Sequence, residues 1–365
     1  PLGVIRSLGQ EGIKTIVIRD KESGHFASIN TSIYADKVYF ADSNEEALQI
    51  LLENYSNEQL KPVLFFTYEG HVDFCDSHYD ELKDKFIFYN TGKKGGLSRL
   101  NNKEIQCQLA SECGMQVPQY EILAKGDLPK QVPYPIITKT LTSTESGWKR
   151  DMIVCHNEKE LKEAYSTILA ERIMIEEYID ATNEFDIKGF SINGGEQIYF
   201  TYQKTWHYKD PQKRWLMYFA PCENEDIKQK LTAMIQKANY SGIFDAEFLQ
   251  KQNGDLVFLE VNWRTGMYNY NHTVAGVNLP FLWAKSTIDG KIDYANIKPT
   301  MPTYTAMDEM SFADVLRKPK RLIQWLKALH KADVLFYYHH KDRRPCWIAW
   351  KHFFKRKISN TIRHK

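Results

Sequence analysis

Paired cysteines and long apolar runs are both missing from this chain of 365 residues. Its six cysteines are scattered without a C-x-x-C pair, which argues against a zinc site or a disulfide framework and fits a reducing, cytoplasmic compartment. No segment approaches the roughly 18 consecutive apolar residues that a membrane-spanning helix needs. With 43% hydrophobic and 26% charged residues, the composition is that of a globular protein with two or three domains.

Internal repeats, low-complexity tracts and a Walker A motif are also absent from the sequence. The glycine-rich run at 92–98 lacks the G-x-x-x-x-G-K-[ST] spacing, so we interpret it as a linker. The chain begins at Pro1 without a methionine and without a strand before its first helical pattern. We therefore expect the first strand of the N-terminal domain, and any targeting signal, to precede Pro1.

Acidic and basic residues are unevenly distributed, although the formal net charge is +2. Residues 317–365 contain 15 Lys and Arg against Asp333 and Asp342, a net charge of +13. The remaining 33 bases and 44 acids give residues 1–316 a net charge of −11. An acidic body with a basic tail indicates an anionic partner, such as a membrane surface or a nucleic acid.

The order of the predicted elements indicates a protein of mixed α/β and α+β class. Short β-rich runs alternate with helical patterns over residues 1–98, which predicts a doubly wound parallel α/β domain. A helix that ends near Gly114 opens a strand-rich second domain over residues 99–300, with further helices expected at 158–171 and 225–238. Residues 301–365 are expected to form a basic, aromatic C-terminal extension.

A hairpin at residues 244–262 carries the clearest chemical signal. Asn253-Gly254 favours a two-residue type I′ turn, which fixes the register of the two strands. The facing pairs are then Glu247 with Glu260 and Asp245 with Asn262. Because side chains alternate between faces, all four polar groups point to one side, where opposed carboxylates repel unless a cation lies between them. The hairpin therefore predicts a site for Mg²⁺, which prefers oxygen ligands, with a solvated acidic face as the alternative.

Two basic side chains, Lys139 and Arg264, occupy positions that favour an anionic partner. Lys139 ends the apolar strand pattern 134–138, and a cation in such a buried strand needs an anionic partner. Arg264 follows Asn262 by two residues, so it shares the face of the proposed metal ligands and can neutralise charge on a transferred group. The polar loop at 142–149 is a candidate phosphate loop, although ordinary hairpins use the same residue types.

These segments occur in the same order in the ATP-grasp superfamily, and residues 100–285 resemble its two-lobed domain. The run 242–248, followed by 259–264, looks like the superfamily's E…E-x-N-x-R metal and catalytic motif. Residues 102–118 resemble the helix that supplies one nucleotide-binding lysine, and residues 135–139 resemble the strand that supplies a second.

The resemblance implies a role for each polar residue in these motifs. ATP would be bound by two lysines, by a loop folded over the phosphates, by an adenine hinge and by a ribose-binding acid. These residues are Lys103, Lys139, Ser146, Glu176, Glu177, Tyr178, Ile179 and Glu184. The implied ligands of Mg²⁺, for which Mn²⁺ could substitute, are Glu247, Glu260 and Asn262. The implied catalytic cations are Arg264, Lys149 and Lys204.

Within the superfamily the layout resembles carboxylate–amine ligases of the carbamoyl-phosphate-synthase-like branch, D-aspartate ligases above all. The run 274–280 is similar to a segment of those enzymes. This likeness implies that an acid such as D-aspartate is activated as an acyl phosphate and joined to an amine. The acceptor would be a cell-envelope or surface-polymer precursor, linked to a nucleotide or a lipid.

Aromatic residues are interleaved with the cations of the tail. Trp and Tyr prefer the level of lipid headgroups, and cations gain free energy near anionic lipid, so residues 317–365 predict a peripheral contact with the inner face of a membrane. Nucleic acid is the less favoured partner because the tail shows no base-reading motif. A third interpretation is that the cations cover the acidic body or bind an anionic sugar-nucleotide acceptor.

Two further functions compete with a ligase. The first is a regulatory protein that binds ATP without catalysis, and the second is an adaptor that binds nucleic acid through its tail. The like-charged pair of Glu247 and Glu260 argues against the regulator, because without chemistry there is no reason to keep it. The aromatic segments 205–208 and 267–272 are expected either to bind the acceptor or to pack between lobes.

Overall fold

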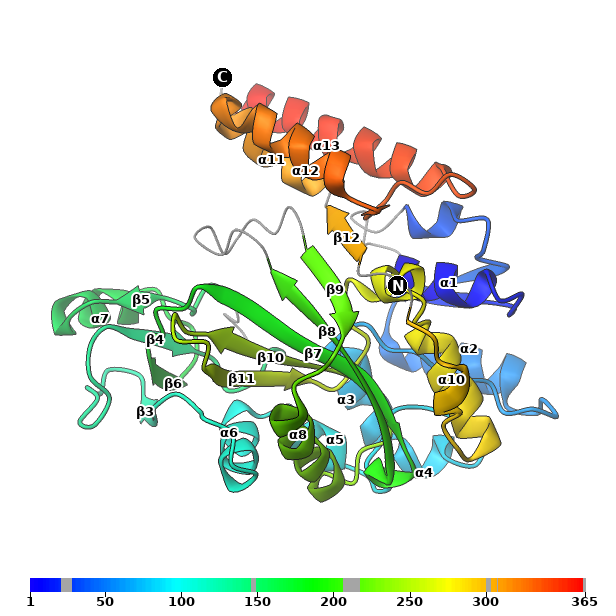
Figure 1. Ribbon diagram of the computed structural model, residues 1–365, viewed down its shortest axis with the longest axis horizontal. Coiled ribbons are helices and arrows are strands. Elements are labelled where there is room, and N and C mark those ends of the chain that lie inside the picture. The colour runs from blue at the N-terminus through cyan, green and yellow to red at the C-terminus, as the bar shows by residue number, and fades with distance from the viewer. Residues whose placement is uncertain (21–27, 146–148, 206–216, 300–302, 307, 364–365) are drawn as a thin grey trace.

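The computed structural model describes residues 1–20, 28–145, 149–205, 217–299, 303–306 and 308–363. It confirms a mixed α/β protein with three sheets, and Figure 1 shows a small lobe at one side of a larger body. Within the described residues, no helix is long and apolar enough to cross a bilayer. The six cysteines lie within these residues and none of them forms a disulfide.

The N-terminal region is built around a parallel strand pair, as the alternating pattern predicts. Strand β1 pairs with β2 from Ile16 opposite Lys37 onward, and a parallel bridge between Val63 and Ile87 follows. The side chain of Ser43 accepts the N–H of Glu46 and starts helix α2. The elements are α1 (Leu2–Gly9), β1 (Ile16–Asp20), β2 (Lys37–Ala41), α2 (Asn44–Tyr55), α3 (Glu69–Ser77), α4 (Tyr79–Leu82) and α5 (Gly96–Leu100).

The small lobe is a four-stranded antiparallel sheet in the order β3-β6-β4-β5. Helix α7 ends at Tyr165, not at residue 171 as expected. The hydroxyls of Ser166 and Thr167 donate to the carbonyls of Glu163 and Ala164, which turns the chain out of the helix. The elements are α6 (Lys103–Glu112), β3 (Tyr120–Ala124), β4 (Ile136–Lys139), β5 (Val154–Cys155), α7 (Glu158–Tyr165) and β6 (Arg172–Glu177).

The body contains a seven-stranded sheet in the order β11-β10-β7-β8-β9-β12-β13. Its pairs are antiparallel except for β12 with β13. Asn224 caps helix α8, which lies toward the bottom of Figure 1. The elements are β7 (Asn183–Ile192), β8 (Gln197–Thr205), β9 (Met217–Pro221), α8 (Glu225–Lys237), β10 (Gly242–Gln250), β11 (Leu256–Asn262), α9 (Asn269–Val274) and α10 (Leu279–Asp289).

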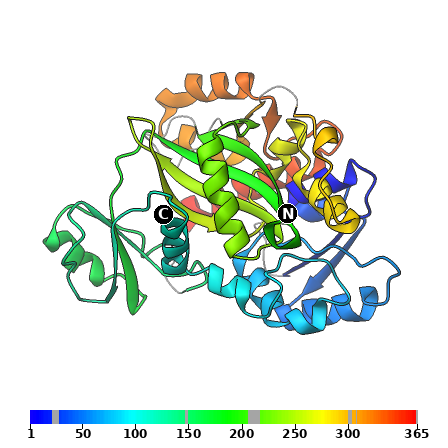
Figure 2. The same ribbon diagram turned by 60° about the horizontal axis from the view of Figure 1, so that its bottom comes forward.

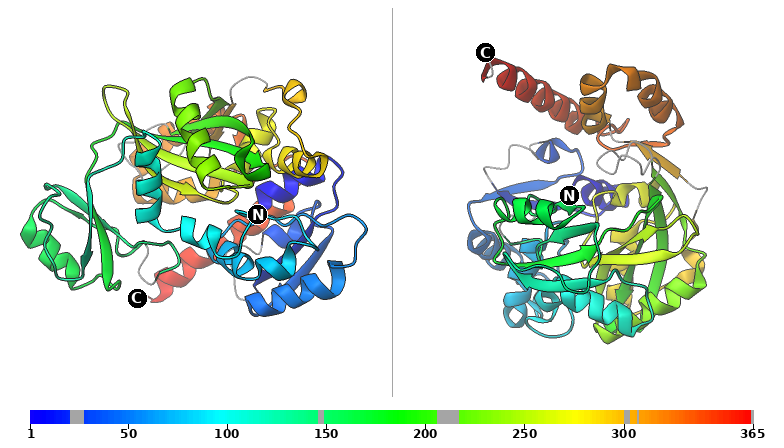
Figure 3. Two further views of the ribbon diagram at one scale, coloured as in Figure 1. Left: turned by 90° about the horizontal axis from the view of Figure 1, so that it is seen from below. Right: turned by 90° about the vertical axis from the view of Figure 1, so that its left-hand side faces the viewer.

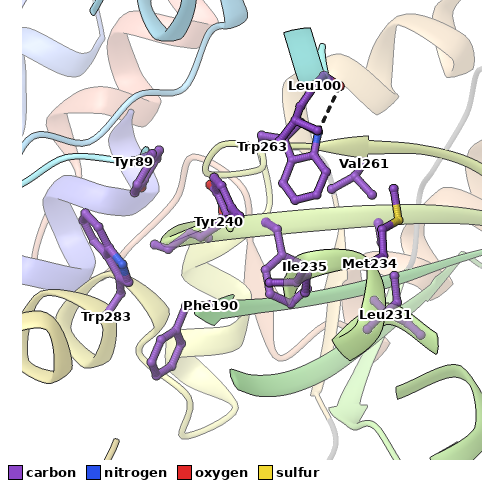
Figure 4. Close-up of a cluster of buried hydrophobic side chains, with 14 of the residues drawn as sticks. Tyr89, Leu100, Phe190, Leu231, Met234, Ile235, Tyr240, Val261, Trp263 and Trp283 are labelled. Carbon is purple, nitrogen blue, oxygen red and sulfur yellow. Dashed lines mark hydrogen bonds between the residues drawn. The ribbon is translucent and has the colours of Figure 1, made fainter. Parts of the chain in front are cut away.

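One apolar core joins this sheet to the N-terminal region. Figure 4 shows Tyr89 beside Trp283, with ring centroids 4.7 Å apart, and Tyr240 beside Trp263 at 4.8 Å. The indole N–H of Trp263 donates to the carbonyl of Leu100 over 3.1 Å. This core ties the end of α5 and helix α6 to the end of β11.

The C-terminal segment is built into the fold. Strand β12 (Thr303–Ala306) extends the large sheet beside β9, and β13 (Val334–Leu335) follows as its last strand. The remaining elements are α11 (Asp308–Arg317), α12 (Leu322–Lys331) and α13 (Arg344–Arg363). These helices form a layer at the top of Figure 1, and Figures 2 and 3 show the small lobe projecting from the body away from the N-terminal strands.

A buried ion pair connects this segment to the first helix. Arg6 donates to the carboxylate of Asp342 over 2.9 Å, and both side chains are at most 1% exposed. Arg6 also donates to the carbonyl of Tyr337 at 2.7 Å. Asp342 in turn accepts from the hydroxyl of Ser32 and the N–H of Ile33. Every charged group in the cluster therefore has partners, as a buried ion pair requires.

We expect Asp342→Asn to lower the free energy of unfolding by about 3–5 kcal/mol, because it leaves the buried Arg6 without its counter-ion. Urea denaturation followed by circular dichroism measures this change. The matched control is Lys162→Gln, which removes the exposed pair with Glu158 and should cost less than about 1 kcal/mol. Equal losses in the two variants would contradict the assigned role of the buried pair.

Candidate active site

The predicted register of the hairpin is correct where the polar residues lie, but the predicted turn is wrong. Lys251 pairs with Asp255 across three intervening residues, and Gly254 adopts a positive φ of 94°. Phe248 therefore faces Phe258, one residue out of the expected register. A β-bulge at Leu259 restores the pairing and places Glu247 opposite Glu260.

The bulge decides which side chains face the site. Glu247, Glu260 and Asn262 are half-buried on one face, and the amide of Asn262 donates to Glu247 over 2.9 Å. Asp245 lies opposite Asn262 but pairs with the buried Lys188 of β7. Gly266 makes room for this pair, because a Cβ there would lie 2.6 Å from an Asp245 oxygen. Three of the four expected oxygen groups thus remain near a metal position.

Helix α6 brings Lys103 onto this hairpin, and its predicted contact with ATP phosphates stays a prediction. Lys103 is its first residue, and its ammonium group lies 2.7 Å from Glu260. Burial alone would raise the pKa of Glu260, but the positive charge of Lys103, with Lys139 and Arg264 further away, lowers it below the ordinary value. Burial likewise opposes the charge of Lys103, yet Glu260 raises the lysine's pKa. Both groups are therefore held in their charged forms.

Gln106 fixes the distance between the helix and the hairpin. Its side-chain amide donates to the carbonyl of Val261 over 3.1 Å and accepts the N–H of the same residue at 2.6 Å. It also donates to the carbonyl of Leu100. The sequence analysis did not identify Gln106, because a glutamine on an amphipathic helix gives no sign that it will pair with a distant strand.

The second predicted lysine comes from the small lobe. Lys139 at the end of β4 forms a hydrogen-bonded ion pair with Glu176 of β6, the strand beside it. Both side chains are buried, with Glu176 2% exposed. Glu176 is thus the anionic partner that the buried Lys139 requires, so the lysine has a partner even when no ligand is bound. The small lobe can therefore fold before any nucleotide binds.

The chain segment after β6 was predicted as the adenine hinge. The N–H of Glu177 donates to Gln119 and that of Tyr178 donates to Pro135, each over 2.9 Å. A base could therefore meet the carbonyl of Glu177 rather than its N–H. Ile179 belongs to a small apolar cluster between this hinge and the hairpin, together with Ala181, Leu249 and Val257. Such a cluster matches the flat apolar face of a nucleobase.

For the four remaining predicted residues, the structure describes fewer contacts. Glu184 lies half-buried at the start of β7, opposite Leu249 of the hairpin. Lys149 is exposed. Lys204 lies on β8, with its backbone beside Phe185 and Tyr218, while its side chain and the whole of Ser146 are outside the described residues. Whether these four residues bind nucleotide stays a prediction.

The N-terminal region contributes a side chain that the sequence analysis missed. Glu69, the first residue of α3, accepts from Arg264 over 2.5 Å, and Arg264 also donates to Asn262 at 3.1 Å. Glu69 is 7% exposed, so Arg264 is aimed by a carboxylate from another part of the chain. An isolated acid at a helix start is too common a pattern to signal such a role.

In the aromatic segment 267–272, His272 packs in the interior. His272 lies edge-on to Phe219, with ring centroids 4.7 Å apart, and its side chain is fully buried. Burial, with Lys188 nearby, lowers the pKa of His272 well below its usual range and keeps it neutral. Packing is therefore the better interpretation for this histidine, whereas residues 206–208 lie outside the described residues.

The donor set fits a hard cation that is shared with a ligand. A narrow cleft is lined by Glu69, Asn101, Lys103, Gln106, Ser143, Glu260, Val261 and Asn262. In the part of the chain that the structure describes, no group of three His, Cys, Asp or Glu forms a complete metal cage. Two carboxylates and an amide are instead what Mg²⁺ uses when substrate phosphates complete its coordination.

Residues 108–274 match the family model of the ATP-grasp domain. The chain thus contains an ATP-grasp domain, as the motifs indicate. N5-carboxyaminoimidazole ribonucleotide synthase of Staphylococcus epidermidis is 23% identical over 241 residues, which cover 62% of this chain and 63% of that protein. The match therefore spans less than two thirds of the curated relative.

Solved structures share the fold at low sequence identity. An L-amino acid ligase from Bacillus licheniformis superposes with a TM-score of 0.63 and 16% identity, covering 83% of this chain and 76% of that one. N5-carboxyaminoimidazole synthetase from Staphylococcus aureus, complexed with ADP, gives a TM-score of 0.64 and 18% identity, covering 83% and 78%. At such identities the likeness concerns the fold.

The lowered pKa of Glu260 predicts how stability changes with pH. Because the folded pKa lies below the unfolded value of 4.5, ionised Glu260 stabilises the fold fully above 4.5, and this contribution is lost as pH falls through the folded pKa. We expect Glu260→Gln to melt a few degrees below the wild type near neutral pH. The difference should shrink in acid, and a constant difference would contradict the assignment. Exposed Glu163→Gln serves as the control.

Proposed function

We propose that this protein is an ATP- and Mg²⁺-dependent ligase that joins a carboxylate to an amine through an acyl phosphate. The observation that carries the proposal is the apposition of Glu247 and Glu260, with Lys103 and Arg264 beside them. Two carboxylates facing each other are unfavourable without a cation, and phosphoryl transfer needs a cation at that place. The ATP-grasp domain supports the same reaction class.

The residues act mainly by positioning and charge. Mg²⁺ would be held by Glu247, Glu260 and Asn262, and when bound it would neutralise the phosphate oxygens; Mn²⁺ could replace it. Lys103 is held charged by Glu260, and its ammonium group lies at the cleft, where it would contact a phosphate oxygen. Lys139 forms an ion pair with Glu176.

Arg264 is placed to act on the acyl group. Glu69 and Asn262 hold its guanidinium at the hairpin, where it can stabilise charge on the carboxylate as the γ-phosphoryl group is transferred. The amine then attacks the carbonyl carbon, inorganic phosphate leaves, and the amine loses a proton. Lys149 and Lys204 are proposed to neutralise charge during the transfer, together with the loop around Ser146.

An amino acid is the proposed activated acid, D-aspartate among the candidates, and a nucleotide- or lipid-linked envelope precursor is the proposed amine. Support comes from the resemblance of residues 274–280 to D-aspartate ligases and from a structural neighbour described as an L-amino acid ligase. We further propose that the protein works in the cytoplasm at the inner face of the membrane, because its basic segment suits an anionic surface.

The reaction class can be tested before the substrates are known. With ATP, Mg²⁺ and a panel of amino acids, we expect hydroxylamine to trap the acyl phosphate as a hydroxamate, with phosphate released in equal amount. Adding amine acceptors should give amide in place of hydroxamate. Normal binding of ATP with Mg²⁺, but no phosphate release with any acid and amine, would contradict the ligase proposal.

Glu260→Gln should lower the phosphate-release rate by about a hundredfold or more, because it removes a metal ligand and the counter-ion of Lys103. The fold should persist, as near-ultraviolet circular dichroism can check. Glu163→Gln, an exposed change in α7, should leave the rate unchanged. Wild-type activity in Glu260→Gln would remove the metal assignment.

A further inference from the structure

Helix α12 presents an uncovered apolar stripe on the outside of the molecule. Leu322, Ile323 and Leu326 are 43%, 67% and 50% exposed. At 100° per residue these three positions fall within one face of the helix. Three large aliphatic side chains on one face of a single short helix are an unusual surface for water, so this face is suited to an apolar partner.

The adjoining face of α12 holds it to the protein. Trp325 packs against Phe312 of α11, with ring centroids 5.1 Å apart, and Phe312 also contacts Trp350 of α13. The pairing of β12 with β13 continues this anchoring into the large sheet. The stripe therefore lies on the exposed side of a helix that packs in the layer of α11, α12 and α13 (Figure 1).

Along the sequence, cations flank the stripe without an acid between them. Residues 317–332 contain six Lys or Arg and no Asp or Glu. Lys318 and Lys320 lie in the turn before α12, and Lys327 follows the stripe on the helix, all three being exposed. An aliphatic face bordered by basic residues is typical of a helix that lies in the headgroup region of an anionic bilayer.

We propose that α12 and the turn before it dock on an anionic phospholipid surface, with Leu322, Ile323 and Leu326 entering the headgroup layer. This assigns the membrane contact to one helix and does not depend on the ligase reaction. A second copy of the chain is a poorer occupant, because a symmetric contact would bring two equally basic faces together. Nucleic acid would leave the aliphatic stripe without a partner, since its stacking partners are aromatic rings.

Flotation with lipid vesicles tests the proposal on the full chain. We expect wild-type protein to float with phosphatidylcholine vesicles that contain about 30% phosphatidylglycerol, but not with phosphatidylcholine alone, and to be released by salt. The double variant Ile323→Glu with Leu326→Glu should lower the bound fraction by about tenfold or more. The matched control is Ile288→Glu on α10, a position 59% exposed and away from the stripe, which should bind as the wild type does.

A second variant keeps the test decisive if the charge reversal disturbs folding. Lys318→Gln, Lys320→Gln and Lys327→Gln together should abolish the preference for anionic vesicles while circular dichroism stays unchanged. Point changes are used because truncation would also remove Asp342 and its buried pair with Arg6. Failure of the wild type to float, or equal flotation of the α12 variants, would overturn the proposal. So would a dimer that the α12 variants convert to a monomer, or salt-sensitive binding to DNA or RNA instead of vesicles.

Discussion

The electrostatic constraint at the centre of this protein is the apposition of Glu247 and Glu260 on neighbouring strands. Two such carboxylates repel each other, and the side chains around them hold them in place. Lys103 compensates Glu260, the amide of Asn262 donates to Glu247, and Arg264 lies beside both strands. A cation in this group would be held by two carboxylates and an amide that are already positioned, which suits the site to metal and phosphate.

The compensating groups come from distant parts of the chain, so the site depends on how those parts are joined. Gln106 bonds the backbone of Val261 and sets α6 against β11. The indole N–H of Trp263, just after β11, donates to the carbonyl of Leu100. Glu69 brings the N-terminal region onto Arg264. A displacement between these regions would separate opposite charges, so packing of the shared core and charge compensation in the site stabilise each other.

The C-terminal segment is likewise held in place by packing together with a compensated buried charge. Its β13 completes the large sheet, and Asp342 enters a buried pair with Arg6 in the first helix. The basic residues of this segment therefore lie on elements that are attached to the body at two places, the large sheet and the buried ion pair. This attachment gives the apolar stripe of α12 a defined orientation, and a defined orientation is what a surface contact needs.

The sequence by itself predicted the chemistry that local pattern encodes. Strand alternation and the spacing of Glu247, Glu260, Asn262 and Arg264 predicted one polar face, and Lys139 was predicted from a cation at the end of an apolar strand. The tertiary structure decided what these residues contact. A three-residue turn and a bulge at Leu259 together restored a register that had been predicted from the wrong turn.

Tertiary structure alone showed that Asp245 pairs with Lys188, that Glu69 aims Arg264 and that Asp342 meets Arg6. The paired residues are 57, 195 and 336 positions apart in the chain. Periodicity and spacing act over a few residues, whereas contacts at such separations depend on how whole elements pack. The sequence therefore determined which groups were available for chemistry, and the packing determined which charges neutralise one another.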